Sequence, residues 1–123
     1  MNDFETPLFK KTYDLYKTFC GFRNTVSKKD LYTVWQRSEN CLLELFELIM
    51  SAMQAHRPEK LAALESASVR LNMMRVFVRL MKDLKTIDAK KYLLLQANLD
   101  EIGRMIGGWI RSAKETPQQT RLK

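Results

Sequence analysis

Few side chains in this sequence could carry out chemistry, and they do not form a catalytic or metal-binding pattern. His56 is the single histidine, and no HxxxH, ExxH or CxxC spacing occurs. Cys20 and Cys41 are far apart and form neither a zinc knuckle nor a disulfide framework. A di-iron bundle needs paired Glu-x-x-His motifs, but Met53 stands where that glutamate would have to be. We expect no metal centre and no cofactor.

Two carboxylate pairs remain, Glu44 with Glu47 and Asp100 with Glu101. Paired carboxylates can serve as general acid and base, but on helices they more often form a solvated face or pair with nearby Lys and Arg. Ion pairing is the simpler interpretation here. The sequence therefore predicts a protein without catalytic activity, and no residue is assigned a catalytic role.

The composition favours one all-helical domain. The chain has 123 residues, with 21 Lys and Arg against 14 Asp and Glu, only four glycines and three prolines. This length is sufficient for a core without metal or disulfide support. The acidic amino-terminal stretch does not resemble a signal peptide, and no window approaches ~18 uninterrupted apolar residues. We expect a cytoplasmic protein that is neither secreted nor inserted in a membrane.

Hydrophobic periodicity predicts four amphipathic helices joined by short connections. Ser27 followed by Asp30 resembles a capping box at the start of the second helix, and Pro58 suits the first turn of the third. Pro117 is expected to end the fourth. Short connections favour antiparallel neighbours, so we predict an up-down-up-down antiparallel four-helix bundle over residues 1–123. The predicted helices are 7–26, 27–55, 58–85 and 88–115, followed by a polar tail at 116–123.

The third predicted helix is apolar over more than ~200° of its circumference, whereas a surface helix of a bundle usually has an apolar stripe of ~100° or a little more. Either self-association covers the excess, or this helix is central in the bundle; periodicity favours neither. Arg70 falls within the apolar arc. We expect it to extend towards solvent in preference to acting as a buried functional arginine.

Positive charge is concentrated in the second half of the chain. Residues 58–123 carry 13 basic and 7 acidic residues, so six of the seven excess positive charges lie there. Arg75, Arg79 and Lys82 share one face of the third helix, and Arg104 and Arg111 lie on the fourth. Such a surface would attract a nucleic-acid backbone or an acidic partner. The alternative is a merely solvated face.

Gly103 and Gly107 lie one turn apart within the fourth helix, where each costs about 1 kcal/mol relative to alanine. Close helix packing or an interface explains that cost better than a ligand contact. Because no strand precedes them, these glycines do not form a phosphate-binding loop. Arg104 and Arg111 exclude a membrane GxxxG dimer. Trp109, beside them, could face either the core or an interface.

The chain resembles the accessory variability protein (Avd) of diversity-generating retroelements over nearly its full length. Four segments carry the resemblance. The most specific features are the two arginines spaced by four and the Gly-Arg-x-x-Gly-x-Trp pattern at 103–109. The segments are Thr12-Tyr13-Asp14-Leu15-Tyr16, residues 35–43 (WQRSENCLL), residues 71–80 (LNMMRVFVRL) and residues 100–110 (DEIGRMIGGWI).

The resemblance implies a non-catalytic four-helix bundle that assembles as a ring-like homopentamer. In this family the expected partners are the retroelement reverse transcriptase and RNA, with DNA as a further possibility, and the role is to support mutagenic cDNA synthesis and retrohoming. Arg75, Arg79 and Arg104 are then the best candidates for polymerase or RNA contacts, with Lys82 and Arg111 as less specific support. The alternative is a nonspecific nucleic-acid-binding bundle of the ribosomal-RNA intervening-sequence type, without a polymerase partner.

Overall fold

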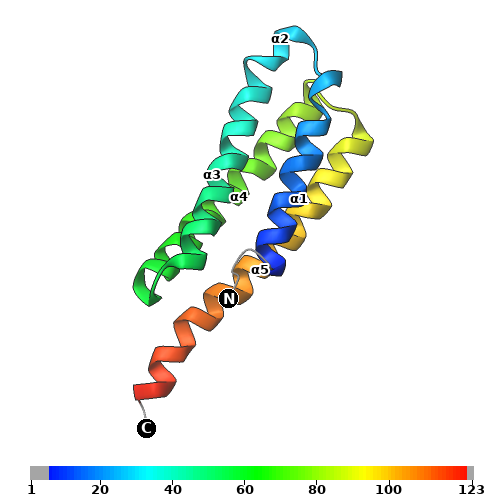
Figure 1. Cartoon of the computed structure of the whole chain (residues 1–123). Helices are drawn as coiled ribbons and strands as arrows, with labels where there is room; N and C mark the ends of the chain where they lie inside the picture. Colours follow the sequence, from blue (N-terminus) through cyan, green and yellow to red (C-terminus); the bar gives the residue numbers. More distant parts are fainter. Residues whose placement is uncertain (1–5, 122–123) are drawn as a thin grey trace.

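The computed structural model describes the backbone of residues 6–121 and the side chains of residues 6–115. The predicted all-α, antiparallel four-helix bundle is confirmed (Figure 1). α1 packs against α3 and α5, and α4 packs between α3 and α5, so α1 and α4 are diagonal neighbours. The four long helices are α1 (Pro7–Gly21), α3 (Val34–Gln54), α4 (Arg57–Asp83) and α5 (Ala89–Arg121).

Side chains cap two of these helices at their amino ends. The Thr6 hydroxyl accepts a hydrogen bond from the Phe9 amide over 3.2 Å, and Pro7 occupies the first turn of α1. The Asp88 carboxylate accepts from the Lys91 amide over 2.9 Å. That hydrogen bond is the main reason why the pKa of Asp88 lies below its ordinary value. The start of α5 at Ala89 agrees closely with the predicted boundary.

Of the first two predicted helices, 7–26 and 27–55, the outer boundaries agree with the structure, but the predicted division between them at 26/27 is wrong. α1 ends at Gly21, a 3₁₀ turn (η2, Arg23–Thr25) follows, and a single helical turn (α2, Lys28–Leu31) precedes α3. The Thr33 hydroxyl donates to the carbonyl oxygens of Lys29 (3.1 Å) and Asp30 (3.3 Å). Those carbonyls would accept the next amides of a continuous helix, so this side chain competes with helix continuation.

The predicted capping box is also wrong in detail. Ser27 is the N-cap residue of α2, but its side chain makes no capping hydrogen bond to the backbone. Its hydroxyl donates instead to a carboxylate oxygen of Asp30, over 3.3 Å. The same oxygen accepts a hydrogen bond from the Thr86 hydroxyl, over 3.2 Å. The Asp30 carboxylate therefore ties α2 to the α4–α5 connection.

The prediction that Pro117 ends the fourth helix is wrong as well. α5 continues through Pro117 to Arg121, so most of the predicted tail at 116–123 is helical, and residues 122–123 lie outside the described part. A proline removes its own amide from the ladder, while the amides that follow can still bond back to earlier carbonyls. In Figure 1 this last part of α5 extends beyond the other helices.

The third helix, predicted at 58–85, spans Arg57–Asp83.

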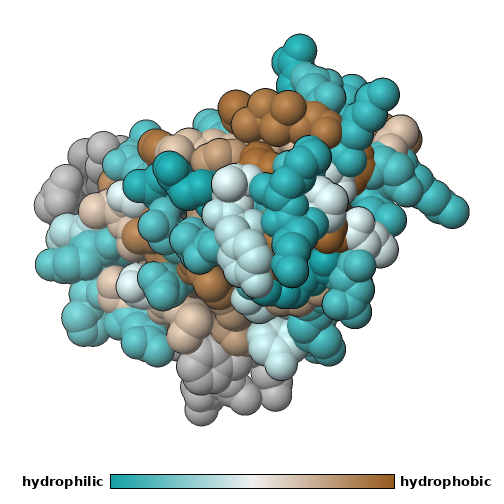
Figure 2. All heavy atoms as spheres, turned by 90° about the horizontal axis from the view of Figure 1, so that it is seen from above, coloured by the Kyte–Doolittle hydropathy of each residue, from teal (hydrophilic) through white to brown (hydrophobic). Residues whose placement is uncertain are grey.

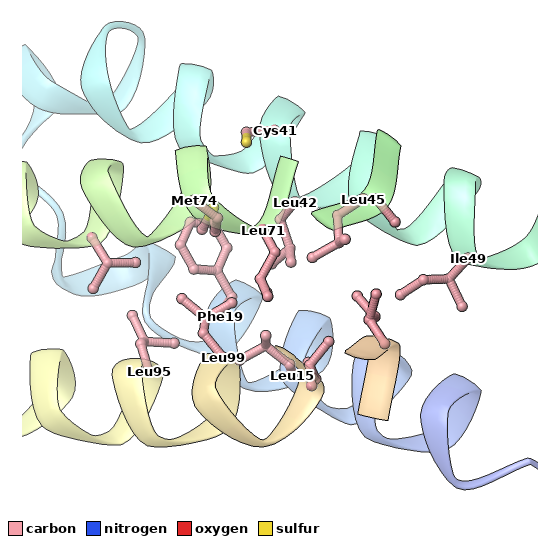
Figure 3. Packing of buried hydrophobic residues seen from close by; sticks show 14 of the residues in the cluster. Leu15, Phe19, Cys41, Leu42, Leu45, Ile49, Leu71, Met74, Leu95 and Leu99 are labelled. Atoms are coloured by element: carbon pink, nitrogen blue, oxygen red, sulfur yellow. The ribbon is translucent and has the colours of Figure 1, made fainter. Parts of the chain in front are cut away.

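The core runs along the bundle axis and receives apolar side chains from all four long helices. Phe19 of α1 stacks on Trp35 of α3, with ring centroids 4.0 Å apart and an interplanar angle of 6°. No helix within the described residues is long and apolar enough to cross a membrane. Figure 3 shows Leu15 and Phe19 from α1, Leu42, Leu45 and Ile49 from α3, Leu71 and Met74 from α4, and Leu95 and Leu99 from α5 meeting in this core.

The outer side of α4 carries a second apolar surface that the described part of the chain leaves exposed. We call it the α4 apolar stripe. Its spacing of three and four residues places it on one face of the helix, and its members are between 38% and 66% exposed. α4 does lie between α3 and α5, but this central position leaves these residues of its apolar arc exposed. They are Val69, Met73, Val76, Leu80 and Leu84.

Candidate nucleic-acid interface

Arg75 is held at the contact between α4 and α5. Its guanidinium forms an ion pair with Asp100 of α5. The side-chain amide of Gln96 donates to the Arg75 carbonyl oxygen over 3.2 Å. The Arg75 side chain is 35% exposed, while its Nε is buried and has no hydrogen-bond partner among the described atoms. A fixed arginine with one edge open to solvent can still offer donors to a phosphate or carboxylate.

Gly103 provides the space into which Arg75 reaches. A Cβ at this position would lie 2.9 Å from Nη2 of Arg75 and 3.0 Å from Cδ2 of Leu71. Both distances are shorter than ordinary van der Waals contact, so both side chains would have to shift. A Cβ at Gly107 would meet only Nη1 of Arg111, on the same helix, at 3.6 Å. Close approach of α4 therefore explains the glycine at 103, whereas no other helix among the described residues comes within 4 Å of a Cβ at 107.

The other predicted cations lie along the same two helices. Arg79, Arg104 and Arg111 are exposed. The Lys82 ammonium lies 4.6 Å from the centroid of the Tyr92 ring, a cation–π contact that links α4 to α5. We use the name α4–α5 basic strip for Arg75, Arg79, Lys82, Arg104 and Arg111.

Arg70 and three of the four carboxylates considered in the sequence form ion pairs. Nε of Arg70 lies 3.4 Å from Glu44, and the side chain is 37% exposed, which confirms the expectation that it extends towards solvent. Glu101 lies 3.0 Å from the Lys11 ammonium, and Asp100 pairs with Arg75. Within the described part of the chain, no three His, Cys, Asp or Glu side chains are grouped closely enough to hold a metal ion.

Trp109 is half-buried against the core and lines an open pocket of about 620 Å³. The Lys60 ammonium lies 5.1 Å from the centroid of its ring. Sequence periodicity did not indicate this pocket, because it joins the α3–α4 connection to a part of α5 about 50 residues later in the chain. The only local signal is the presence of His56, Arg57 and Lys60 within five residues, with Pro58 and Glu59 between the last two.

The site residues described above all fall within a match to one protein family. A family model described as bAvd-like matches residues 8–113, which is most of the chain. The chain belongs to the bAvd-like family. Neither the comparison with curated proteins nor the comparison with solved structures gave a match. The bAvd-like match includes the whole α4–α5 basic strip and Trp109, and it agrees with the resemblance to Avd accessory proteins.

Proposed function

We propose that this bAvd-like protein is a non-catalytic accessory factor of a diversity-generating retroelement, acting in the cytoplasm. It binds the retroelement reverse transcriptase and its template RNA through the α4–α5 basic strip and so supports mutagenic cDNA synthesis and retrohoming. The observation that carries the proposal is the family match over residues 8–113, because charge alone names no partner. The exposed Arg79, Arg104 and Arg111 supply the cationic surface that a polyanion requires.

We further propose that the protein works as a ring-like homopentamer. The α4 apolar stripe supports self-association, because its five apolar side chains remain exposed in the single chain. Its spacing of three and four residues is that of a helix that packs against another helix. Figure 2, which views the bundle from the α2 end, shows brown apolar side chains reaching the surface among teal hydrophilic ones.

The proposal is tested by reversing two exposed charges of the strip. Arg79→Glu with Arg104→Glu leaves the Arg75–Asp100 pair intact and lowers the net charge by four. Lys10→Glu with Lys17→Glu is the matched control, because both lysines are exposed on α1, diagonally opposite α4. We expect the strip variant to bind template RNA at least tenfold more weakly at low salt. Binding of the variant should also release about two fewer counterions, which lowers the slope of log affinity against log salt concentration. The control should bind like the wild type.

Binding is measured by fluorescence anisotropy of labelled RNA over a range of salt concentrations, and by co-elution with the reverse transcriptase. If the strip variant and the control variant lose the same amount of RNA affinity, the net charge of the protein determines binding and the α4–α5 basic strip has no special role. Failure of the wild-type protein to co-elute with the polymerase, combined with equal affinity for any RNA sequence, would contradict the proposal. Those two results would support a nonspecific nucleic-acid-binding bundle.

A further inference from the structure

An open pocket lies beside Trp109, and the α4–α5 basic strip makes no use of it. It lies between the α3–α4 connection and the carboxyl-terminal half of α5, the green turn and the orange-to-red segment of Figure 1. Its volume of about 620 Å³ is within the range of small-ligand sites, which is ~300–1,000 Å³. The lining residues are Ala55, His56, Arg57, Lys60, Gly108, Trp109, Ser112 and Ala113.

The lining combines nitrogen donors with one aromatic surface. Three of its residues, His56, Arg57 and Lys60, carry basic groups, and no described lining residue carries a carboxylate. The pocket should therefore attract anions. The position of Lys60 is fixed, because its ammonium donates to the Ala52 carbonyl oxygen over 2.5 Å and contacts the Trp109 ring.

Trp109 adds a requirement that a simple anion does not meet. A half-exposed indole offers a flat apolar surface, and Gly108 beside it has no side chain to fill the adjacent space. A free phosphate would leave this surface wet, whereas an uncharged aromatic molecule would leave three basic groups unused. A ligand that has both a flat ring and a phosphate satisfies both halves of the pocket.

We propose that this pocket binds one unpaired nucleotide of a single-stranded RNA, with its base against Trp109 and its phosphate at Arg57 and Lys60. The proposal rests on the proposed function in one respect, since it assumes that RNA reaches this protein. It adds that the protein recognises an unstacked base, and not only the charge of the backbone. Affinity should then depend on the presence of bases.

The test compares two octamers of equal charge, octauridylate and an abasic octamer, with uridine monophosphate as a third ligand. We expect octauridylate to bind about tenfold more tightly than the abasic octamer and to quench tryptophan fluorescence. Trp35 is fully buried, so the quenching should persist in Trp35→Phe and disappear in Trp109→Leu. Trp109→Leu should bind both octamers equally, at the affinity of the wild type for the abasic octamer.

A second variant does not disturb the apolar core. Arg57→Gln with His56→Gln changes only exposed side chains and should weaken octauridylate binding severalfold, while Lys10→Gln with Lys17→Gln should not. Circular dichroism checks that all variants keep the wild-type helicity.

Equal affinity of the wild type for both octamers would overturn the pocket proposal and leave the proposed function standing. Binding of uridine monophosphate as tight as that of octauridylate would overturn the assignment to a strand in favour of a free nucleotide. If neither octamer binds, both the pocket proposal and the proposed RNA binding fail.

Discussion

At the scale of single residues, Tyr16 joins α1 to α3 through a polar contact at the edge of the core. Its hydroxyl donates to a Glu39 carboxylate oxygen over 2.9 Å, and Arg23 approaches the same carboxylate at 3.7 Å. Hydrogen bonding with the Cys20 thiol, burial and the hydrogen bond to Glu39 raise the pKa of Tyr16 well above its ordinary value of 10.0. Folding therefore favours the neutral phenol.

This pKa shift predicts a loss of stability at alkaline pH. The Tyr16 contribution is complete below pH ~10, where the phenol is neutral in both states, and is lost as the pH rises above the unfolded pKa. We expect the free energy of unfolding of Tyr16→Phe to fall less steeply above that pH than that of the wild type. Urea denaturation between about pH 8 and 11 measures the difference. Tyr32→Phe, at an exposed position, should keep the wild-type slope, and a shared slope for all three proteins would contradict the prediction.

At the scale of elements, α4 ends in a Schellman motif. The Thr86 amide donates to the Met81 carbonyl oxygen over 2.8 Å, and the Lys85 amide donates to that of Lys82 over 3.0 Å. Lys85 has φ of 64°, the left-handed conformation in which glycine is the usual residue. A lysine at this position stores backbone strain.

Lys85→Gly should relieve that strain. We expect it to raise the free energy of unfolding by about 0.5–1 kcal/mol. This net gain is the strain energy removed from the folded state minus the entropic stabilisation that a glycine gives to the unfolded chain. Urea denaturation at neutral pH measures this gain. Lys85→Ala removes the same charge and keeps the strain, so it should bring no comparable gain. A similar gain from Lys85→Ala would indicate a charge effect.

At the scale of the whole molecule, the position of α4 decides which surfaces are left for partners. α3 and α5 cover its two flanks and α1 lies diagonally opposite, so the α4 apolar stripe faces away from the bundle. The basic strip lies on the flank of α4 next to α5. One helix therefore serves the core, the proposed oligomer contact and the proposed polyanion contact on different parts of its circumference.

Val76→Glu with Leu80→Glu should dissociate the proposed pentamer, because an interface that buried these side chains would then bury unpaired carboxylates. Light scattering after size exclusion should give about 14.5 kDa for this variant and about five times that mass for the wild type. Leu93→Glu is the control, because Leu93 is exposed on α5, outside the stripe. Dissociation by Leu93→Glu alone would place the interface elsewhere, and a monomeric wild type would contradict the assembly itself.

The sequence by itself determined the all-helical class, the antiparallel bundle and the family resemblance. These depend on local signals: helical periodicity, short connections, and motifs within one helix such as residues 103–109. It also identified the cations of the basic strip, because the position of each Lys and Arg is given directly by the sequence. The ends of α4 and the start of α5 were predicted closely, since Pro58 and the turn before Ala89 act over one helical turn.

Only the tertiary structure decided which surfaces are covered and which residues meet. The hydrogen bond between Thr86 and Asp30 joins residues 56 positions apart in the sequence. Arg75 of α4 contacts Asp100 and Gly103 of α5. The pocket beside Trp109 likewise exists only where the α3–α4 connection and α5 come together. Periodicity measures how wide an apolar arc is, but the neighbours of a helix determine how much of that arc is buried. For that reason the exposed stripe on α4 is a result of packing.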